Sequence, residues 1–174
     1  MKSWKPEFSS DLLYFITTST NFHAELFSDN VSKQIILDQF DCARRNSQFI
    51  LFSFVIMPTH IHFISKFSKS LTMSDFMRNF KSLSSNRISR YLQATPYRTN
   101  VNFEKIWEDD YVAKEIYTTA FLMQKLDYIH RNPCKEPWVL AENPEDYPWS
   151  SARFYLTDQT SIIPIDDLWE YLNP

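Results

Sequence analysis

The order of apolar and polar positions predicts strands and helices over most of the chain. Residues 12–22 are rich in β-branched and aromatic side chains, which is typical of a strand. Residues 49–57 form an almost continuous apolar run and predict a buried strand, whereas residues 60–67 alternate like a strand with two different faces. Pro58 and Thr59 separate these two segments. Residues 106–116 predict another strand, either straight or bent.

Three further segments have the period of a helix. Ser28, Asp29 and Asn30 supply caps for a helix that continues to about residue 46. A long helix is expected over about residues 72–93, where apolar side chains recur every three or four positions. Another is expected over about residues 118–132, because Pro133 disfavours helical backbone at the residue before it. Short turns and a small terminal helix follow.

The resulting order, β-α-β-β-α-β-α, predicts an α+β fold. Adjacent strands of this kind favour a ferredoxin-like (RRM-like) antiparallel sheet with helices packed mainly on one face. The chain contains no internal repeat and no low-complexity linker. We therefore expect one domain over residues 1–174, with a C-terminal extension from about residue 133.

Composition excludes several classes of function. None of the 174 residues is glycine, so a P-loop, a GxGxxG dinucleotide turn and a GxSxG nucleophile elbow are all excluded. Cys42 and Cys134 are the only cysteines, and they form no CxxC motif for a disulfide framework or a thiolate zinc site. The first seven residues lack the apolar core of a signal peptide, and the longest apolar run is too short for a bilayer. We expect a cytoplasmic protein.

Positive charge gathers in one segment although the formal net charge is −3. Residues 66–98 hold seven basic side chains against a single acid, Asp75. A bound polyanion responds to such local asymmetry more than to the total charge. The alternative is an ordinary solvated helix face, which a charge run by itself does not exclude.

The first feature with chemical potential is the pair His60 and His62. Positions i and i+2 of a strand project from the same face, so both imidazoles are expected to point the same way. Two neighbouring imidazoles suit a divalent metal ion. An HxH pair is weak evidence by itself, and a third ligand has to come from another part of the chain.

The second feature is Tyr128, which precedes Asn132 by four residues and therefore shares a helical face with it. The apolar stripe of this helix consists of Leu122, Leu126 and Ile129, and Tyr128 lies well away from its centre. Two interpretations stay open at this point. Tyr128 is either a tyrosine at the margin of the core, with Asn132 as a helix cap, or a functional residue with Asn132 beside it.

Four segments, taken together, resemble one family. Residues 55–63 (VIMPTHIHF), 76–88 (FMRNFKSLSSNRI), 128–133 (YIHRNP) and 144–151 (PEDYPWSS) are similar, in the same order, to the motifs of REP-associated tyrosine transposases. These are relatives of the small single-strand insertion-sequence transposases in the HUH superfamily, which use a single tyrosine. The resemblance covers most of the chain from about residue 12 to residue 155.

The resemblance implies a reaction and its residues. His60 and His62, with Asn132 as third ligand, would hold Mg²⁺ or Mn²⁺, and this ion would polarise the scissile phosphate. Tyr128 would attack the phosphorus atom, which gives a 5′-phosphotyrosine and a free 3′-hydroxyl group. A second strand's 3′-hydroxyl could then reseal the backbone without ATP. The implied activity is that of a DNA strand transferase and endonuclease.

The resemblance also gives the basic segment a partner, which is single-stranded or hairpin DNA. Arg78, Lys81 and Arg90 would neutralise phosphates of the hairpin. Arg87 falls within the apolar stripe of its helix, so it either extends past the core to solvent or serves the DNA-binding site. Related transposases often act as dimers, and the sequence leaves a homodimer and a monomer open.

This chain departs from the family pattern at three places. Thr59 stands where the family commonly has asparagine before the first histidine, and residues 108–110 are acidic near a position that is often glycine. After Pro133, residues 135–138 replace the usual small residues. None of these changes removes a proposed ligand or the nucleophile.

Two other functions compete with strand transfer. A domesticated hairpin-binding protein would keep the fold and the DNA affinity without cleavage, but it would have no use for His60, His62, Tyr128 and Asn132 together. A ferredoxin-like phosphoesterase needs a second histidine motif, which neither His23 nor His130 supplies. We expect these two histidines to be structural, and residues 144–151 to serve packing.

Overall fold

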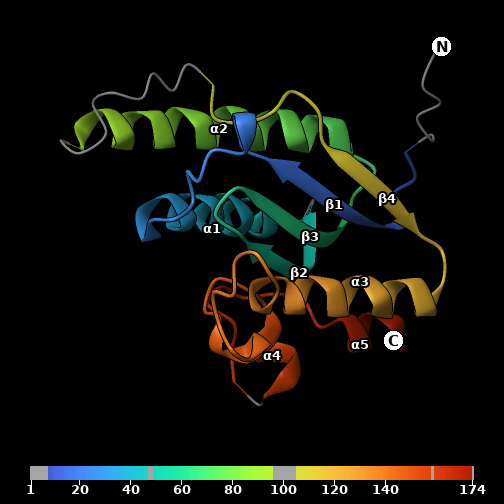
Figure 1. The fold of residues 1–174 in the computed structure, drawn as a ribbon. Coiled ribbons are helices and arrows are strands. Elements are labelled where there is room, and N and C mark those ends of the chain that lie inside the picture. Colours follow the sequence, from blue (N-terminus) through green and yellow to red (C-terminus); the bar gives the residue numbers. More distant parts are fainter. Residues whose placement is uncertain (1–7, 47–48, 96–104, 158, 174) are drawn as a thin grey trace, which may run out of the picture.

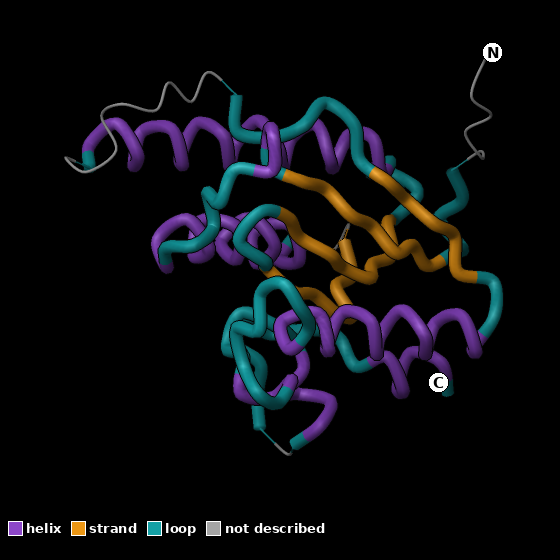
Figure 2. The backbone as a smooth tube through the Cα atoms, in the orientation of Figure 1, coloured by secondary structure: helices purple, strands orange, loops and turns teal. Residues whose placement is uncertain are grey.

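The computed structural model describes residues 8–46, 49–95, 105–157 and 159–173, and its core is a four-stranded antiparallel sheet (Figures 1 and 2). The strand order is β2-β3-β1-β4. The predicted α+β class with an antiparallel sheet is confirmed. The strands are β1 (Leu13–Ser19), β2 (Phe49–Ile56), β3 (His60–Phe67) and β4 (Val112–Ile116).

Alternation along β3 separates the two faces of the sheet. Ile61 and Phe63 belong to a core cluster with the first two long helices, whereas Ile64 belongs to a second cluster on the opposite face. By the period of two, His60 and His62 lie on the same face as Ile64. The register places β1 beside β3 with Thr17 opposite His62.

Two long helices cover the first face, and a side-chain cap begins each of them; the cap at Asp29 was predicted. Helix α1 (Asn30–Arg45) starts where the Asp29 carboxylate accepts from the Ser32 backbone N–H, and α2 (Met73–Ala94) starts where Thr72 accepts from that of Asp75. Aromatic rings fill the space between these helices and the sheet. Phe40 of α1, for example, contacts Phe63 and Phe80, each with ring centroids 5.1 Å apart.

Helix α3 (Thr119–Arg131) crosses the other face of the sheet, opposite α2 in Figure 1. Its buried side chains Leu122, Leu126 and Ile129 share a cluster with Phe15 and Phe52. The expectation of helices on one face thus describes α1 and α2, while α3 and the two short C-terminal helices pack on the other side. The reason is that β2 is apolar on both faces and needs cover on both. These short helices are α4 (Ala152–Leu156) and α5 (Leu168–Leu172).

Residues 144–151 pack against the outer edge of β2, as predicted. The Ile56 N–H donates to the Trp149 carbonyl at 2.9 Å, and the Ser151 N–H donates to that of Phe54 at 2.9 Å. The buried Tyr147 hydroxyl donates to the Ile56 carbonyl at 2.8 Å. The segment therefore satisfies backbone groups at this sheet edge, next to the turn that leads to His60.

Two predicted strands are shorter in the structure. β1 ends at Ser19 and continues into a 3₁₀ turn (Asn21–His23), and β4 begins only at Val112. Of residues 106–111, Trp107 makes a single bridge to Thr20 instead of a ladder. The chain bends there because three acidic side chains follow in a row, and such residues are poor in strands.

Three smaller expectations concern other parts of the chain. Cys42 and Cys134 are both free. In the described residues no helix is long and apolar enough to cross a membrane. The first seven residues, used above to argue against a signal peptide, and Arg98 of the basic segment lie outside the described residues.

Candidate active site

The imidazoles of His60 and His62 point from β3 toward α3, with ring centroids 4.7 Å apart. The predicted shared face is confirmed. His62 is only 4% exposed and His60 is half-buried. Burial, the nearby His60 and the Lys125 charge lower the pKa of His62 to about 3. Burial is also the main cause that lowers the pKa of His60. Both rings are therefore neutral at pH 7, which is the form that binds metal ions.

Two threonine hydroxyls hold the histidine rings. Thr17 Oγ1 lies 2.7 Å from Nδ1 of His62, across the β1–β3 pair, and Thr59 Oγ1 lies 2.9 Å from Nδ1 of His60. Phe15 stacks on the His62 ring at 5.5 Å between centroids. With Nδ1 engaged, Nε2 of His62 is the nitrogen left for a ligand. The departure at Thr59 thus keeps a polar partner for the first histidine.

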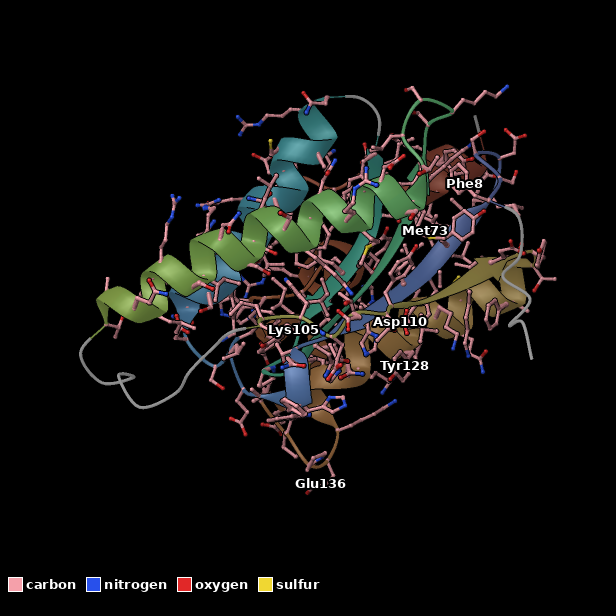
Figure 3. The ribbon with its side chains drawn as sticks, turned by 90° about the horizontal axis from the view of Figure 1, so that it is seen from above. Phe8, Met73, Lys105, Asp110, Tyr128 and Glu136 are labelled. Atoms are coloured by element: carbon pink, nitrogen blue, oxygen red, sulfur yellow. The ribbon has the colours of Figure 1, made fainter. Side chains whose placement is uncertain are left out.

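Helix α3 brings Tyr128 and Asn132 to the histidines. The Tyr128 ring, labelled in Figure 3, meets the His62 ring edge-on, with centroids 5.1 Å apart, and Tyr128 is 37% exposed. The Asn132 side chain forms a hydrogen bond with His60. α3 stops at Arg131, and Asn132 and Pro133 continue as a 3₁₀ turn, which presents the carboxamide at the helix end. Tyr128 is therefore not a core tyrosine.

The three proposed ligands fit a divalent ion. Nε2 of His62 is buried and has no hydrogen-bond partner in the described part of the chain, an arrangement that costs free energy unless a ligand takes the lone pair. Within that same part, no three His, Cys, Asp or Glu side chains lie close enough to bind a metal. The Asn132 amide oxygen, a hard donor of the type that Mg²⁺ and Mn²⁺ accept, is the group near His60 that could complete such a set.

Two lysines that the sequence analysis did not single out border Tyr128. The ammonium groups of Lys125 and Lys135 each lie 5.5 Å from the centroid of the Tyr128 ring. Lys125 precedes Tyr128 by three residues on α3, and this helical spacing was the signal available in the sequence. Thr17 was also missed. Thr17 is a polar residue two positions after the apolar Phe15 on β1, and this interruption of the apolar face was the signal available in the sequence.

The four basic residues expected to bind DNA all lie on α2, on the opposite side of the sheet from the histidines (Figure 1). Arg78 pairs with Asp75 at 2.7 Å, and Arg87 pairs with Asp38 of α1 at 2.6 Å. Arg87 therefore reaches past the apolar stripe to the rim of the two helices and does not approach the histidine site. Arg90 is exposed.

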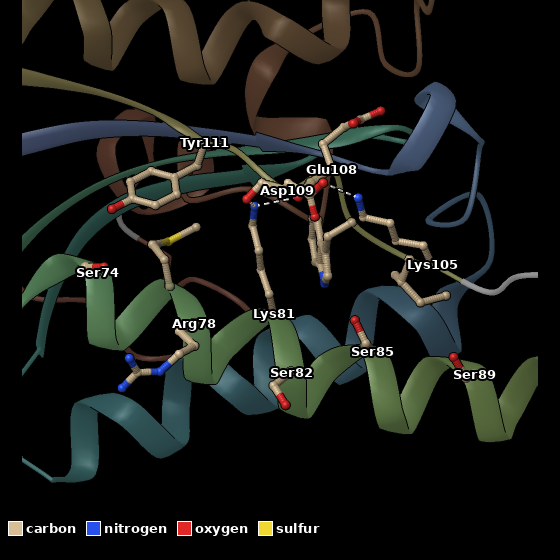
Figure 4. A pocket seen from close by; sticks show the side chains of 13 residues that line it. Ser74, Arg78, Lys81, Ser82, Ser85, Ser89, Lys105, Glu108, Asp109 and Tyr111 are labelled. Atoms are coloured by element: carbon tan, nitrogen blue, oxygen red, sulfur yellow. Dashed lines mark hydrogen bonds and ion pairs between the residues drawn. The ribbon is translucent and has the colours of Figure 1, made fainter. Parts of the chain in front are cut away.

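Lys81 is occupied within the fold, in contrast to the expectation of a phosphate contact. Its ammonium donates to the carbonyls of Glu108, Asp109 and Asp110, at 2.8, 3.2 and 2.8 Å (Figure 4). Partial burial is the main cause that lowers its pKa to about 8. The side chain anchors the acidic bend to α2. A groove of about 460 Å³ lies between them, lined in part by Ser82, Ser85 and Ser89.

The remaining histidines differ from one another. His130 is buried, and its Nε2 lies 3.1 Å from Ser151 Oγ and 3.3 Å from Ser53 Oγ, so its structural role is confirmed. His23, in contrast, is exposed and has a positive φ of 51°. Its charge contributes to lowering the pKa of His60, so it lies near the histidine site.

Comparison with known proteins assigns this chain to a family. Residues 8–132 match the model of the family described as IS200-like transposase. A search of curated proteins finds no significant match.

Among the solved structures that are similar to this chain, the first named below shares its fold. One is a REP-associated tyrosine transposase bound to a REP hairpin, with 19% sequence identity and a TM-score of 0.70. The match covers 88% of this chain and 84% of that one. Another is a protein from Deinococcus radiodurans R1, provisionally assigned as a transposase, with 19% identity and a TM-score of 0.49 over 74% of this chain and 95% of that one.

Proposed function

Because the chain belongs to the IS200-like transposase family, we propose that it cuts and rejoins single-stranded DNA beside a hairpin, with Tyr128 as the nucleophile. One observation carries this proposal. The Tyr128 ring lies 5.1 Å from the His62 ring, at a helix end whose Asn132 contacts His60. A protein that only binds DNA would need none of these contacts.

In the proposed reaction, the hydroxyl oxygen of Tyr128 forms a bond to phosphorus while the bond from phosphorus to the 3′-oxygen breaks. The phenol proton passes to solvent, and the departing 3′-oxygen takes up a proton. The products are a 5′-phosphotyrosine and a 3′-hydroxyl group. In the reverse sense, the 3′-hydroxyl of another strand attacks phosphorus and releases Tyr128, so joining needs no external energy source.

His60, His62 and Asn132 would hold Mg²⁺ or Mn²⁺. Such an ion supplies Lewis-acid polarisation of the scissile phosphate when it is bound. Thr17 and Thr59 position the two imidazoles by engaging Nδ1. The partly exposed Tyr128 hydroxyl approaches substrate from solvent, whereas the histidines stay in a mostly buried, low-dielectric setting.

The proposed partner is hairpin DNA, as in the solved REP-associated transposase, whose description names a bound REP hairpin. We propose that Arg78, Arg87 and Arg90 contact phosphates of the hairpin from the α2 side. The exposed carboxylate pairs of the first two can exchange for phosphates at little cost. Lys81 acts indirectly, because it holds the bend at residues 108–110.

We further propose one working domain over residues 1–174 in the cytoplasm. Ile163, Leu168 and Tyr147, all beyond residue 133, share the two core clusters with the sheet, which supports a single unit. Tyr128 contacts His62 of its own chain, which supports a complete site in each monomer even if a homodimer forms.

The test uses a pool of single-stranded oligonucleotides, each with a hairpin stem and randomised flanks, incubated with the protein and Mn²⁺ or Mg²⁺. We expect a denaturant-resistant protein–DNA adduct, absent with Tyr128→Phe although that variant still binds the hairpins. Tyr117→Phe is the matched control, because Tyr117 is 70% exposed and lies at the end of β4. Hairpin binding by the unmodified protein without any adduct would identify the domesticated binder instead.

A further inference from the structure

We propose that Lys125 and Lys135, the lysine pair, bind backbone phosphates of the single strand that flank the bond cut by Tyr128. This inference rests on the proposed function and adds a substrate-positioning site to it. Both ammonium groups lie 5.5 Å from the centroid of the same tyrosine ring, so they stand no more than twice that distance apart. Neighbouring phosphates of one strand can span such a separation.

Lys125 is held in place before any DNA arrives. Its ammonium lies 4.9 Å from the Phe15 ring centroid and 5.1 Å from that of Phe121, in addition to Tyr128. Three aromatic faces around one cation restrict its position without neutralising its charge. A preorganised cation loses less conformational entropy when it binds an anion.

The lysine pair also differs from most of the arginines in lacking a carboxylate partner. Within the described residues, neither Lys125 nor Lys135 forms an ion pair, whereas six other basic side chains do. Those six are Arg44, Arg45, Arg78, Arg87, Lys105 and Arg131. The positive charge beside Tyr128 is therefore available to an external anion, whereas two of the four basic side chains of α2, Arg78 and Arg87, are already paired with carboxylates.

A third lysine strengthens the positive field. Lys114 of β4 pairs in register with Phe15 and so projects from the same face of the sheet as the histidines. Burial and repulsion by Lys114 both lower the pKa of Lys125. Like charges gathered without acids are unfavourable until an anion joins them, and a chain of phosphodiesters supplies one negative charge per nucleotide.

The chemistry favours a nucleic-acid backbone over an acidic protein segment. The cations surround the side chain that is proposed to attack a phosphodiester, so a strand placed for that attack must bring its adjacent phosphates to them. Phe15 and Phe121 are largely covered by Lys125 and by the core, so base stacking is not required for the contact.

The experiment measures DNA binding in the Tyr128→Phe background, where no adduct forms, over a range of salt concentrations. Each lost phosphate contact lowers the slope of log affinity against log salt by about 0.7 for a single strand, which is about a 4-fold loss at 0.15 M salt. We expect this change for Lys125→Gln and for Lys135→Gln, and roughly a 14-fold loss for both together. Lys125→Arg should retain binding.

Arg45→Gln is the control, because Arg45 is exposed, lies at the end of α1 on the opposite side of the sheet from Tyr128, and stands outside the basic segment of residues 66–98. A second arm replaces single phosphates beside the cut site with uncharged methylphosphonates. Each methylphosphonate that replaces a contacted phosphate should weaken binding to the protein that keeps both lysines. The same methylphosphonate should have no further effect on the variant in which the matching lysine is glutamine.

Equal salt slopes for the double variant and Arg45→Gln would overturn the inference, as would methylphosphonate effects that persist unchanged when the matching lysine is glutamine. The same slope with a polyglutamate peptide as with DNA would also overturn it, because the site would then attract anions in general. If the unmodified protein forms no adduct, the proposed function fails instead, and this outcome is separate from the lysine measurements.

Discussion

Replacing Thr17 by valine tests whether the strand beside the histidines orients the metal site. The change keeps the shape of the side chain and removes the hydroxyl that lies 2.7 Å from Nδ1 of His62. Because His62 is 4% exposed, no water replaces the lost partner, and Nδ1 stays buried without a hydrogen bond. We expect the free energy of unfolding to fall by about 1–3 kcal/mol.

Metal affinity and adduct formation should fall as well, because an imidazole whose second nitrogen has no hydrogen-bond partner binds metal less well. Loss of such a partner typically lowers metal affinity or activity about 10–100-fold. Urea unfolding measures the loss of stability. A Mn²⁺ titration, with thermal stability and adduct formation as its two readouts, measures the loss of metal affinity. Thr17→Ser retains the hydroxyl and should restore most of the stability and most of the Mn²⁺ affinity.

The neighbouring residue supplies the control. Thr18 is buried on the other face of β1, whereas Thr17 is half-buried, and the Thr18 hydroxyl has no hydrogen-bond partner in the described structure. Thr18→Val should therefore leave stability unchanged or raise it, because a buried polar group without a partner is removed. Equal destabilisation by the two valine variants, with equal Mn²⁺ affinity, would refute the role assigned to Thr17.

Three further predictions follow from the same geometry. Mn²⁺ at about 100 times its Kd should stabilise the protein by about 2.7 kcal/mol in thermal or urea unfolding, and His62→Ala should abolish this gain; an unchanged gain would exclude His62 as a ligand. Mixing His60→Ala with Tyr128→Phe should not restore adduct formation, because each chain holds its own tyrosine against its own histidine; recovery would show that tyrosine serves the partner chain. Burial lowers the pKa of Lys33 below its value in the unfolded chain, so the charged side chain opposes folding at pH 7. This penalty disappears as the pH rises from the folded pKa toward the unfolded pKa, because the folded protein then loses the proton first. Lys33→Met should be at least as stable at pH 7 and should lack that alkaline gain in urea unfolding; a variant much less stable at pH 7 would contradict this.

Most secondary structure followed from local patterns. Caps at Asp29, Thr72 and Thr118 begin the three long helices, close to where each helix was expected to start, because a side-chain oxygen there accepts a free N–H of the first turn. The strand predicted over 106–116 was too long. Its first half is held by contacts remote in sequence, namely the Lys81 ammonium and the Thr20–Trp107 bridge, which a local pattern does not contain.

The charge pattern along the chain does not show which cations the fold compensates. Basic residues near one another on α2 attracted attention, yet Arg78 and Arg87 are paired and Lys81 is occupied within the fold. Lys125 and Lys135 were overlooked because neither belongs to a run of charge. Whether a cation is compensated depends on the side chains that the fold brings beside it.

The sequence by itself determined that His60 and His62 share one face and that Tyr128 and Asn132 share another, because strand and helix periods are properties of the local backbone. Only the tertiary structure decided that these two faces meet. It did so by packing α3, and not α1 or α2, against the histidine side of the sheet, and by pairing β1 with β3 so that Thr17 reaches His62. Such choices depend on how the whole chain buries both faces of its sheet, and no local period contains that information.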